Sequence, residues 1–263
     1  MTLTSIDHRQ HTSGATTTMV ASAVGASAVA ALTILVWWSG SPSGRYLDHA
    51  GTDHPTGLPM LATFVAAWLL MTVASMLPTA LPLLTSFRSV VAGRRGAAGL
   101  VAVVVGGFLI VWTLAGVAMA SIDLAVHQLV ERTALGRHAW LIAVGALTLA
   151  GTYQLTPLAM RCLHACRSPL GFLGRHWTGA PDVRRQSLTI GLDYGLSCLG
   201  CCAGLMAVMF AVGMANPWWM VGLGVVSGAE KIASFGRELA TATGVVLLVV
   251  AAMLTLPHLS VAG

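Results

Sequence analysis

Three of the five cysteines in the chain lie in one apolar stretch, DYGLSCLGCCAGLMAVMFAVGM, which begins at Asp193. If this stretch is helical, one face carries four sulfur side chains at steps of four, four and three residues, namely Cys198, Cys202, Met206 and Met209. Thiolates and thioethers are the soft ligands that suit monovalent copper, or zinc where thiolates predominate. Cys201 adds a Cys-x-x-Cys spacing from which it can reach the same ion. The pattern is a candidate metal site, although from spacing alone simple core packing is the plainer interpretation.

A second group of possible ligands, Cys162-x-His164-x-Cys166, follows the end of another apolar segment. Cys162 and Cys166 are four residues apart and stack on one helical face, whereas His164 points elsewhere unless the backbone is irregular. On the cytoplasmic side of a membrane such thiols stay reduced and are available as ligands. Because Cys198 is expected near mid-membrane, at a different depth, we predict two metal sites or a transfer route between them.

Glu230 and Lys231 interrupt an otherwise apolar segment. Charges at depth in a membrane are costly, so this polar pair is a functional candidate unless both side chains reach the interface. Asp193 leads into the cysteine face and could pair with Lys231 or Arg185. No Gly-rich phosphate loop with Lys, no HExxH and no G-x-S-x-G elbow occurs in the sequence, so we assign no catalytic residue.

Membrane-spanning helices must position these residues. Of 263 residues, 56% are hydrophobic and 9% charged, with a mean hydropathy of +0.79, whereas a soluble domain carries about 25% charged residues. The net charge of +5 does not indicate nucleic acid, because the basic residues are scattered between apolar runs. We predict an all-α bundle of about seven transmembrane helices forming a single domain, residues 19–263, after a disordered cytoplasmic tail, residues 1–18. The predicted spans are 19–38, 60–84, 100–122, 139–158, 187–214, 217–235 and 239–256.

The positive charges favour an orientation with a cytoplasmic N-terminus in a bacterial inner (plasma) membrane. With alternating spans, eleven basic residues fall inside: Arg9, Arg88, Arg94, Arg95, Arg161, Arg167, Arg175, Arg184, Arg185, Lys231 and Arg237. Three fall outside: Arg45, Arg132 and Arg137. The sixth span must include Glu230 and Lys231 to cross, so it could instead be a re-entrant or interfacial segment.

Several motifs together resemble a bacterial family of predicted metal-binding integral membrane proteins. They are LLMTVASMLPTALPLL, YQLTPLAMRCLHACRSPLGFL, GLDYGLSCLGCCAGLMAVMFAVGMANPWWM and the AEK that ends at Lys231. The resemblance covers roughly residues 60–235 and implies a multi-span protein with metal ligands at Cys162, Cys166, Cys198, Cys201 and Cys202. This chain has Val73, Ala74 and Ser75 where members tend to carry more methionines, and Ala203 where they tend to carry Trp. These departures disfavour a Met-rich copper site more than a Cys site.

We therefore expect a membrane protein that handles or delivers copper, or alternatively zinc, through Cys and Met ligands. Its partners would be the lipid bilayer and a metal-donor or metal-acceptor protein. One rival is a membrane thiol-redox enzyme, or a subunit of a membrane enzyme complex, with a reversible Cys198–Cys201 disulfide. Another is a small-solute transporter in which Glu230, Lys231 and Asp193 act and the cysteines only pack.

Overall fold

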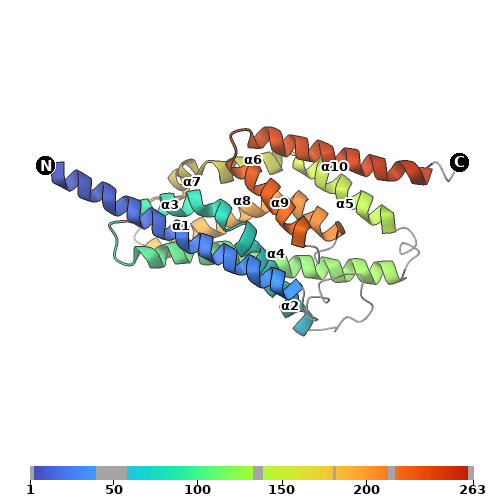
Figure 1. The fold of residues 1–263 in the computed structure, drawn as a ribbon, viewed down its shortest axis with the longest axis horizontal. Coiled ribbons are helices and arrows are strands. Elements are labelled where there is room, and N and C mark those ends of the chain that lie inside the picture. Colours follow the sequence, from blue (N-terminus) through green and yellow to red (C-terminus); the bar gives the residue numbers. More distant parts are fainter. Residues whose placement is uncertain (1–2, 40–57, 133–138, 180–181, 213–216, 260–263) are drawn as a thin grey trace.

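The computed structural model describes residues 3–39, 58–132, 139–179, 182–212 and 217–259, and the regular structure in these ranges is helical. Most of the helices run along the long axis of the molecule, and the two ends of the chain lie at opposite ends of it (Figure 1). Helix α8 is central, because it packs against α4, α5 and α6. The elements are α1 (Leu3–Ser39), α2 (Leu58–Ser75), the short 3-10 helix η2 (Pro78–Ala80), α3 (Leu81–Val90), α4 (Ala97–Arg132), α5 (Ala139–Gln154), α6 (Pro157–Arg167), α7 (Pro169–His176), α8 (Val183–Val212), α9 (Pro217–Ile232) and α10 (Gly236–Leu259).

Four helices in the described ranges are long and apolar enough to cross a membrane, within α1, α4, α8 and α10. Two bent pairs raise this number to at most six: α2 with η2 and α3, bent by 45°, and α5 with α6, bent by 62°. The expected number of about seven is therefore not confirmed. Helix α9 has 16 residues, short of the roughly 20 that a perpendicular span needs.

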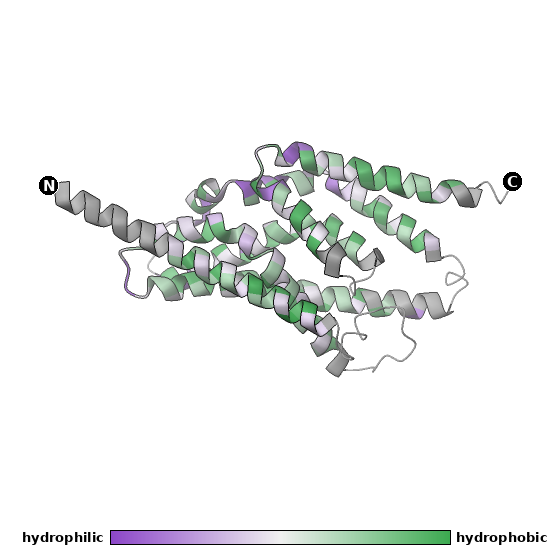
Figure 2. Cartoon of the chain, viewed as in Figure 1, coloured by the Kyte–Doolittle hydropathy of each residue, from purple (hydrophilic) through white to green (hydrophobic). Residues whose placement is uncertain are grey.

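The surface of the bundle is compatible with membrane insertion. Hydrophobic residues cover most of the helical length, and hydrophilic ones gather where α6 ends and α10 begins (Figure 2). Helices α1 and α10 leave much of their apolar surface exposed, as helices that face lipid do. Helix α1 starts at Leu3 and so takes in most of the segment predicted as a disordered tail, whereas the cytoplasmic placement of that segment stays a prediction.

Proline produces the bend between α5 and α6. Pro157 has no N–H to donate to the carbonyl of Tyr153, which instead accepts from both the backbone N–H and the hydroxyl of Thr156 at 2.9 and 2.7 Å. The Thr156 hydroxyl also accepts from the N–H of Ala159 and so caps the start of α6. The chain changes direction here, and α6 comes to lie against α8.

A similar break follows α2. The backbone N–H groups of Met76 and Leu77 both donate to the carbonyl of Thr72, and the Thr79 hydroxyl donates to the Met76 carbonyl at 2.8 Å. The carbonyls of Thr72 and Met76, which flank the break before Pro78, thus have donors within the turn. This turn holds Met76, whose side chain is fully buried, at the end of α2.

Glycines allow α4 and α8 to cross at backbone contact. A Cβ atom on Gly107 would lie 2.7 Å from the carbonyl oxygen of Leu188, and one on Gly191 would collide with the carbonyl of Val104. Small residues at such crossings let helix backbones approach closely. The crossing fixes the height and rotation of α8, and α8 carries the cysteines.

Candidate metal centre

Helix α8 buries all three of its cysteines. The side chains of Cys198, Cys201 and Cys202 are at most 3% exposed. The thiols of Cys201 and Cys202 both donate to the backbone carbonyl of Cys198, at 3.1 and 2.9 Å. The three sulfur atoms are therefore held in the interior of the bundle, and none of them faces lipid.

A second helix adds a fourth thiol to this group. Cys166 of α6 is 5% exposed, and its Sγ lies 3.8 Å from Sγ of Cys201. Cys166, Cys201 and Cys202 are all close enough to Cys198 to interact with its thiol. The expectation that Cys166 lies at a separate depth from the α8 cysteines is wrong, because the bend at Pro157 turns α6 toward them.

The other two members of the Cys-x-His-x-Cys motif lie outside this buried group, although Cys162 is near enough to Cys201 to interact with it electrostatically. Cys162 is half-buried and packs against Gly200 of α8, where an added Cβ atom would lie 2.6 Å from the Cys162 sulfur. His164 is exposed, as its helical position predicts. The structure thus brings Cys166 to the α8 thiols and leaves His164 away from them.

Two further side chains reach the thiols from other elements. The ammonium of Lys231, in the last turn of α9, donates to Sγ of Cys198 at 3.2 Å and to Sδ of Met76 at 3.3 Å. Lys231 is 6% exposed and interacts electrostatically with all four buried thiols. We call the sulfur-bearing residues the sulfur cluster, defined as Met76, Cys166, Cys198, Cys201 and Cys202.

The remaining polar candidates take other partners. Glu230 is 1% exposed, and its carboxylate accepts from Nε2 of Gln154 at 3.0 Å, so it turns toward α5. Asp193 lies 3.4 Å from Nε2 of His176, at the surface. The expected pairing of Asp193 with Lys231 or Arg185 is therefore wrong, because Lys231 turns inward to the sulfur cluster and Asp193 turns to α7.

Arg167 fixes the end of α9 and thereby the position of Lys231. Its guanidinium donates to the carbonyls of Glu230, Ala233 and Ser234, at 2.7, 2.6 and 3.1 Å. A positive charge at a helix C-terminus also interacts favourably with the helix dipole. Gly236 is required beside this contact, because a Cβ atom there would collide with the Glu230 carbonyl and with the Arg167 guanidinium.

The two methionines predicted on the cysteine face are buried on α8, but they are further along it. Met206 is 6% and Met209 2% exposed, and both belong to the same apolar core as the cysteines. Met206 follows Cys202 by about 6 Å along the helix, one turn away. A role for these two methionines as ligands stays a prediction.

Sequence reasoning missed Met76 as a candidate ligand. It also missed Gln154, which donates to Glu230, and Arg167, which holds the end of α9. The signal for Met76 was its place directly before the Leu-Pro break, where a turn can direct a thioether inward. Gln154 and Tyr153 are polar residues near the end of α5 that turn toward other helices: Gln154 donates to Glu230 of α9 at 3.0 Å and Tyr153 to the carbonyl of Gly200 of α8 at 2.7 Å.

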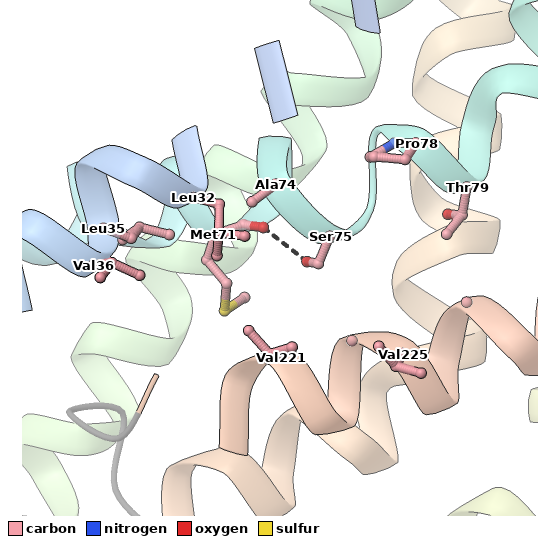
Figure 3. A pocket seen from close by; sticks show the side chains of 12 residues that line it. Leu32, Leu35, Val36, Met71, Ala74, Ser75, Pro78, Thr79, Val221 and Val225 are labelled. Atoms are coloured by element: carbon pink, nitrogen blue, oxygen red, sulfur yellow. Dashed lines mark hydrogen bonds between the residues drawn. The ribbon is translucent and has the colours of Figure 1, made fainter. Parts of the chain in front are cut away.

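An apolar cavity lies beside the sulfur cluster but is not part of it. It has a volume of about 260 Å³ between α1, α2 and α9, and Met71 directs its sulfur toward Val221 there (Figure 3). The few polar groups in its wall are satisfied by the backbone, since Ser75 donates to the Met71 carbonyl at 2.7 Å. None of the sulfur-cluster residues lines this cavity.

The chemistry of the donor set suits a soft cation. Four thiols and one thioether gather in an interior from which water is excluded, and such ligands select monovalent copper. Among the residues that the structure describes, no three His, Cys, Asp or Glu side chains are arranged to hold a metal ion.

Comparison with known proteins gives one match. A family model with the description PpoB2, copper chaperone, matches residues 65–254, a range that includes the whole sulfur cluster. No curated protein and no solved structure was found to match the chain.

Proposed function

Because the chain belongs to the PpoB2 family of copper chaperones, we propose that it is an integral membrane protein that binds Cu⁺ in the sulfur cluster and passes it to a partner protein. The family description supports copper as the cargo. The arrangement of the side chains supports the choice of ligands, and the distribution of positive charge along the sequence supports the membrane orientation.

The contact between Cys166 and Cys201 is the observation that carries this proposal. Their sulfur atoms come from two helices and are 3.8 Å apart. A metal bonded to two thiolates at about 2.3 Å, with a third ligand at roughly trigonal angles, separates the two sulfurs by about 4.0 Å. A soft cation would therefore fit between these thiolates with little movement of α6 against α8, and Cys198, Cys202 or Met76 would supply the third sulfur.

Uptake of the ion must release protons. Each thiol that becomes a ligand loses one proton, so two thiols and Cu⁺ give a dithiolate complex and two protons. In the apolar interior this charge change is unfavourable unless a positive group stands nearby. In the described part of the chain, Lys231 is the positive group nearest to the cluster, and its ammonium can stabilise a thiolate before the ion arrives.

The proposed setting is a bacterial inner (plasma) membrane, with residues 19–263 as one helical domain and the N-terminus in the cytoplasm. Long apolar helices and the uneven distribution of arginine support this topology. Arg88, Arg94, Arg95 and Arg167 then lie on the cytoplasmic side, so the cluster would lie near that side and exchange copper with a donor or acceptor there.

The test is metal content in purified variants. The protein in detergent, loaded with Cu⁺ under reducing conditions and desalted, is expected to retain close to one copper per chain by elemental analysis. The double variants Cys198→Ser with Cys202→Ser and Cys166→Ser with Cys201→Ser should lose it. Cys162→Ser is the comparison variant: this half-buried thiol interacts with Cys201 but is not one of the proposed ligands, so the variant should retain copper. Unchanged copper in both double variants would rule out the sulfur cluster as the site.

The same contact favours a second candidate, thiol redox chemistry. Two thiols at 3.8 Å can form a disulfide if they transfer two electrons and release two protons to an acceptor such as a quinone or a partner disulfide. The structure favours Cys166–Cys201 for such a bond over the predicted Cys198–Cys201 pair. Mass spectrometry after rapid alkylation would detect it, and a fully reduced pair in cells would dismiss this candidate.

A further inference from the structure

Lys231 is the only lysine in the chain, and its environment is unusual for a lysine. In the described part of the chain its ammonium has two hydrogen-bond acceptors, Sγ of Cys198 and Sδ of Met76. Thioether sulfur is a weak acceptor, and ammonium is a strongly hydrated ion that loses water when buried. Full burial of Lys231 in this place therefore calls for an explanation beyond packing.

The carboxylates near Lys231 are directed elsewhere. Glu230, its neighbour on α9, accepts from Gln154 on the side of α5, and Asp193 lies at the surface beside His176. Arg167 of α6 uses its guanidinium on the carbonyls that end α9. Glu230 is still near enough to interact electrostatically with Lys231, but the acceptors in direct contact with the ammonium are the sulfur atoms of Cys198 and Met76.

The ammonium is located where a soft cation would bind. The third sulfur proposed for the ion beside Cys166 and Cys201 is that of Cys198, Cys202 or Met76, and Nζ of Lys231 contacts two of these three, Cys198 at 3.2 Å and Met76 at 3.3 Å. A copper ion that takes either sulfur as its third ligand must displace the ammonium from it. Both ions carry one positive charge. The exchange of one ion for the other is therefore neutral in itself, and the protons that the ligand thiols release are the remaining change in charge; a divalent ion would add one further charge.

We propose that Lys231 is a tethered cation that occupies the third-ligand sulfurs of the copper site, Cys198 and Met76, in the empty protein, leaves them when Cu⁺ binds and returns when Cu⁺ is released. This inference rests on the function proposed above and adds a mechanism of release to it. Because the ammonium is covalently attached beside the site, it always competes with bound copper for the same sulfur atoms. Copper can therefore be bound and still be released to a partner. For a protein that must hand its cargo on, such competition lowers the barrier to transfer.

The fold leaves the lysine a way out. Lys231 is next to the last residue of α9, and the residues that follow it, Ile232, Ser234 and Phe235, are exposed. A lysine side chain is long enough to keep its stem in apolar surroundings while its ammonium reaches the polar boundary. Since Arg167 and Gly236 hold the end of α9, the exchange requires rotation of the side chain and no movement of the helix.

The primary experiment uses the single lysine as a reporter. The full-length protein in detergent is treated with an amine-acetylating reagent, empty or loaded with one equivalent of Cu⁺, and acetylation of Lys231 is followed by mass spectrometry. We expect slow labelling in the empty protein and labelling at least about tenfold faster with copper, the factor that one charge-assisted hydrogen bond represents. The α-amino group of the chain is the internal control and should react equally in both states.

Three outcomes are distinguishable. Faster labelling of Lys231 with copper supports the exchange, and it should disappear in the Cys198→Ser, Cys202→Ser double variant. A protein that retains copper while Lys231 labelling stays unchanged or slows overturns the exchange but keeps the proposed function. A wild-type protein that retains no copper contradicts the proposed function itself.

A substitution gives an independent measurement. Lys231→Met keeps a side chain of similar length but removes the competing charge, so we expect Cu⁺ to bind at least about tenfold more tightly and to leave more slowly to a soluble chelator. Arg237→Met is the matched control, because Arg237 is an exposed cation at the start of α10. Equal or weaker copper affinity in Lys231→Met, with the control unchanged, would also overturn the proposal.

Discussion

Two adjacent glycines of α4, Gly106 and Gly107, offer a sharp test of the helix crossing that positions the cysteines. A Cβ atom on Gly107 would lie 2.7 Å from the Leu188 oxygen and 3.0 Å from the Leu192 nitrogen of α8. A Cβ atom on Gly106 would meet nothing within 4 Å. Each glycine is replaced by alanine in a separate single-substitution variant.

The expected difference follows from two opposing effects. Alanine is favoured over glycine inside a helix by about 1 kcal/mol, and this gain is common to both variants. Only Gly107→Ala must also separate two backbones, which cannot rotate away as a flexible side chain can. Overpacking of this kind costs about 1–3 kcal/mol. We expect Gly106→Ala to be neutral or up to about 1 kcal/mol more stable than wild type, and Gly107→Ala to be about 1–3 kcal/mol less stable than Gly106→Ala.

The assay is thermal or denaturant unfolding in detergent, with all three proteins at one detergent concentration. A second readout is disulfide trapping between Cys166 and Cys201 with a mild oxidant. Because the crossing sets the height of α8, displacing it in Gly107→Ala should slow trapping, whereas Gly106→Ala should leave the rate unchanged. Equal stability and equal trapping in the two variants would refute the close crossing of α4 and α8.

Two further predictions concern residues that hold α9 beside the sulfur cluster. Gln154→Leu leaves the buried Glu230 carboxylate without its amide donor, so the free energy of unfolding should fall by about 1–3 kcal/mol. Adding Glu230→Leu to this variant should restore most of the loss, whereas losses that simply add in the double variant would contradict the pairing. Arg167→Lys keeps the positive charge but loses the planar guanidinium that binds three carbonyls at the end of α9. We expect the free energy of unfolding to fall by about 1–2 kcal/mol and amide hydrogen exchange at the end of α9 to become faster. The control, Arg237→Lys at an exposed site, should change the free energy of unfolding by less than about 0.5 kcal/mol.

The helical class of this protein could be predicted from the sequence, because long apolar runs with few charges have no other way to satisfy their backbone groups away from water. The inward face of α8 could be predicted as well, since a spacing of four residues places Cys198 and Cys202 on one side of any helix. The number of spans could not. Whether a proline bends a helix within one span or separates two depends on the neighbours that pack around the break, as at Pro157.

Only the tertiary structure decided how the candidate site is assembled. Glu230 and Lys231 are adjacent in sequence and invite a reading as one polar pair, yet consecutive side chains on a helix point about 100° apart. Glu230 therefore turns to Gln154 of α5, and Lys231 turns to Cys198 of α8. Cys166 joins the cluster for a similar reason, because its distance from the α8 cysteines is set by the packing of α6 on α8. The order of residues along the chain fixes the direction of each side chain from its own helix, but the partner it meets depends on which helix packs there.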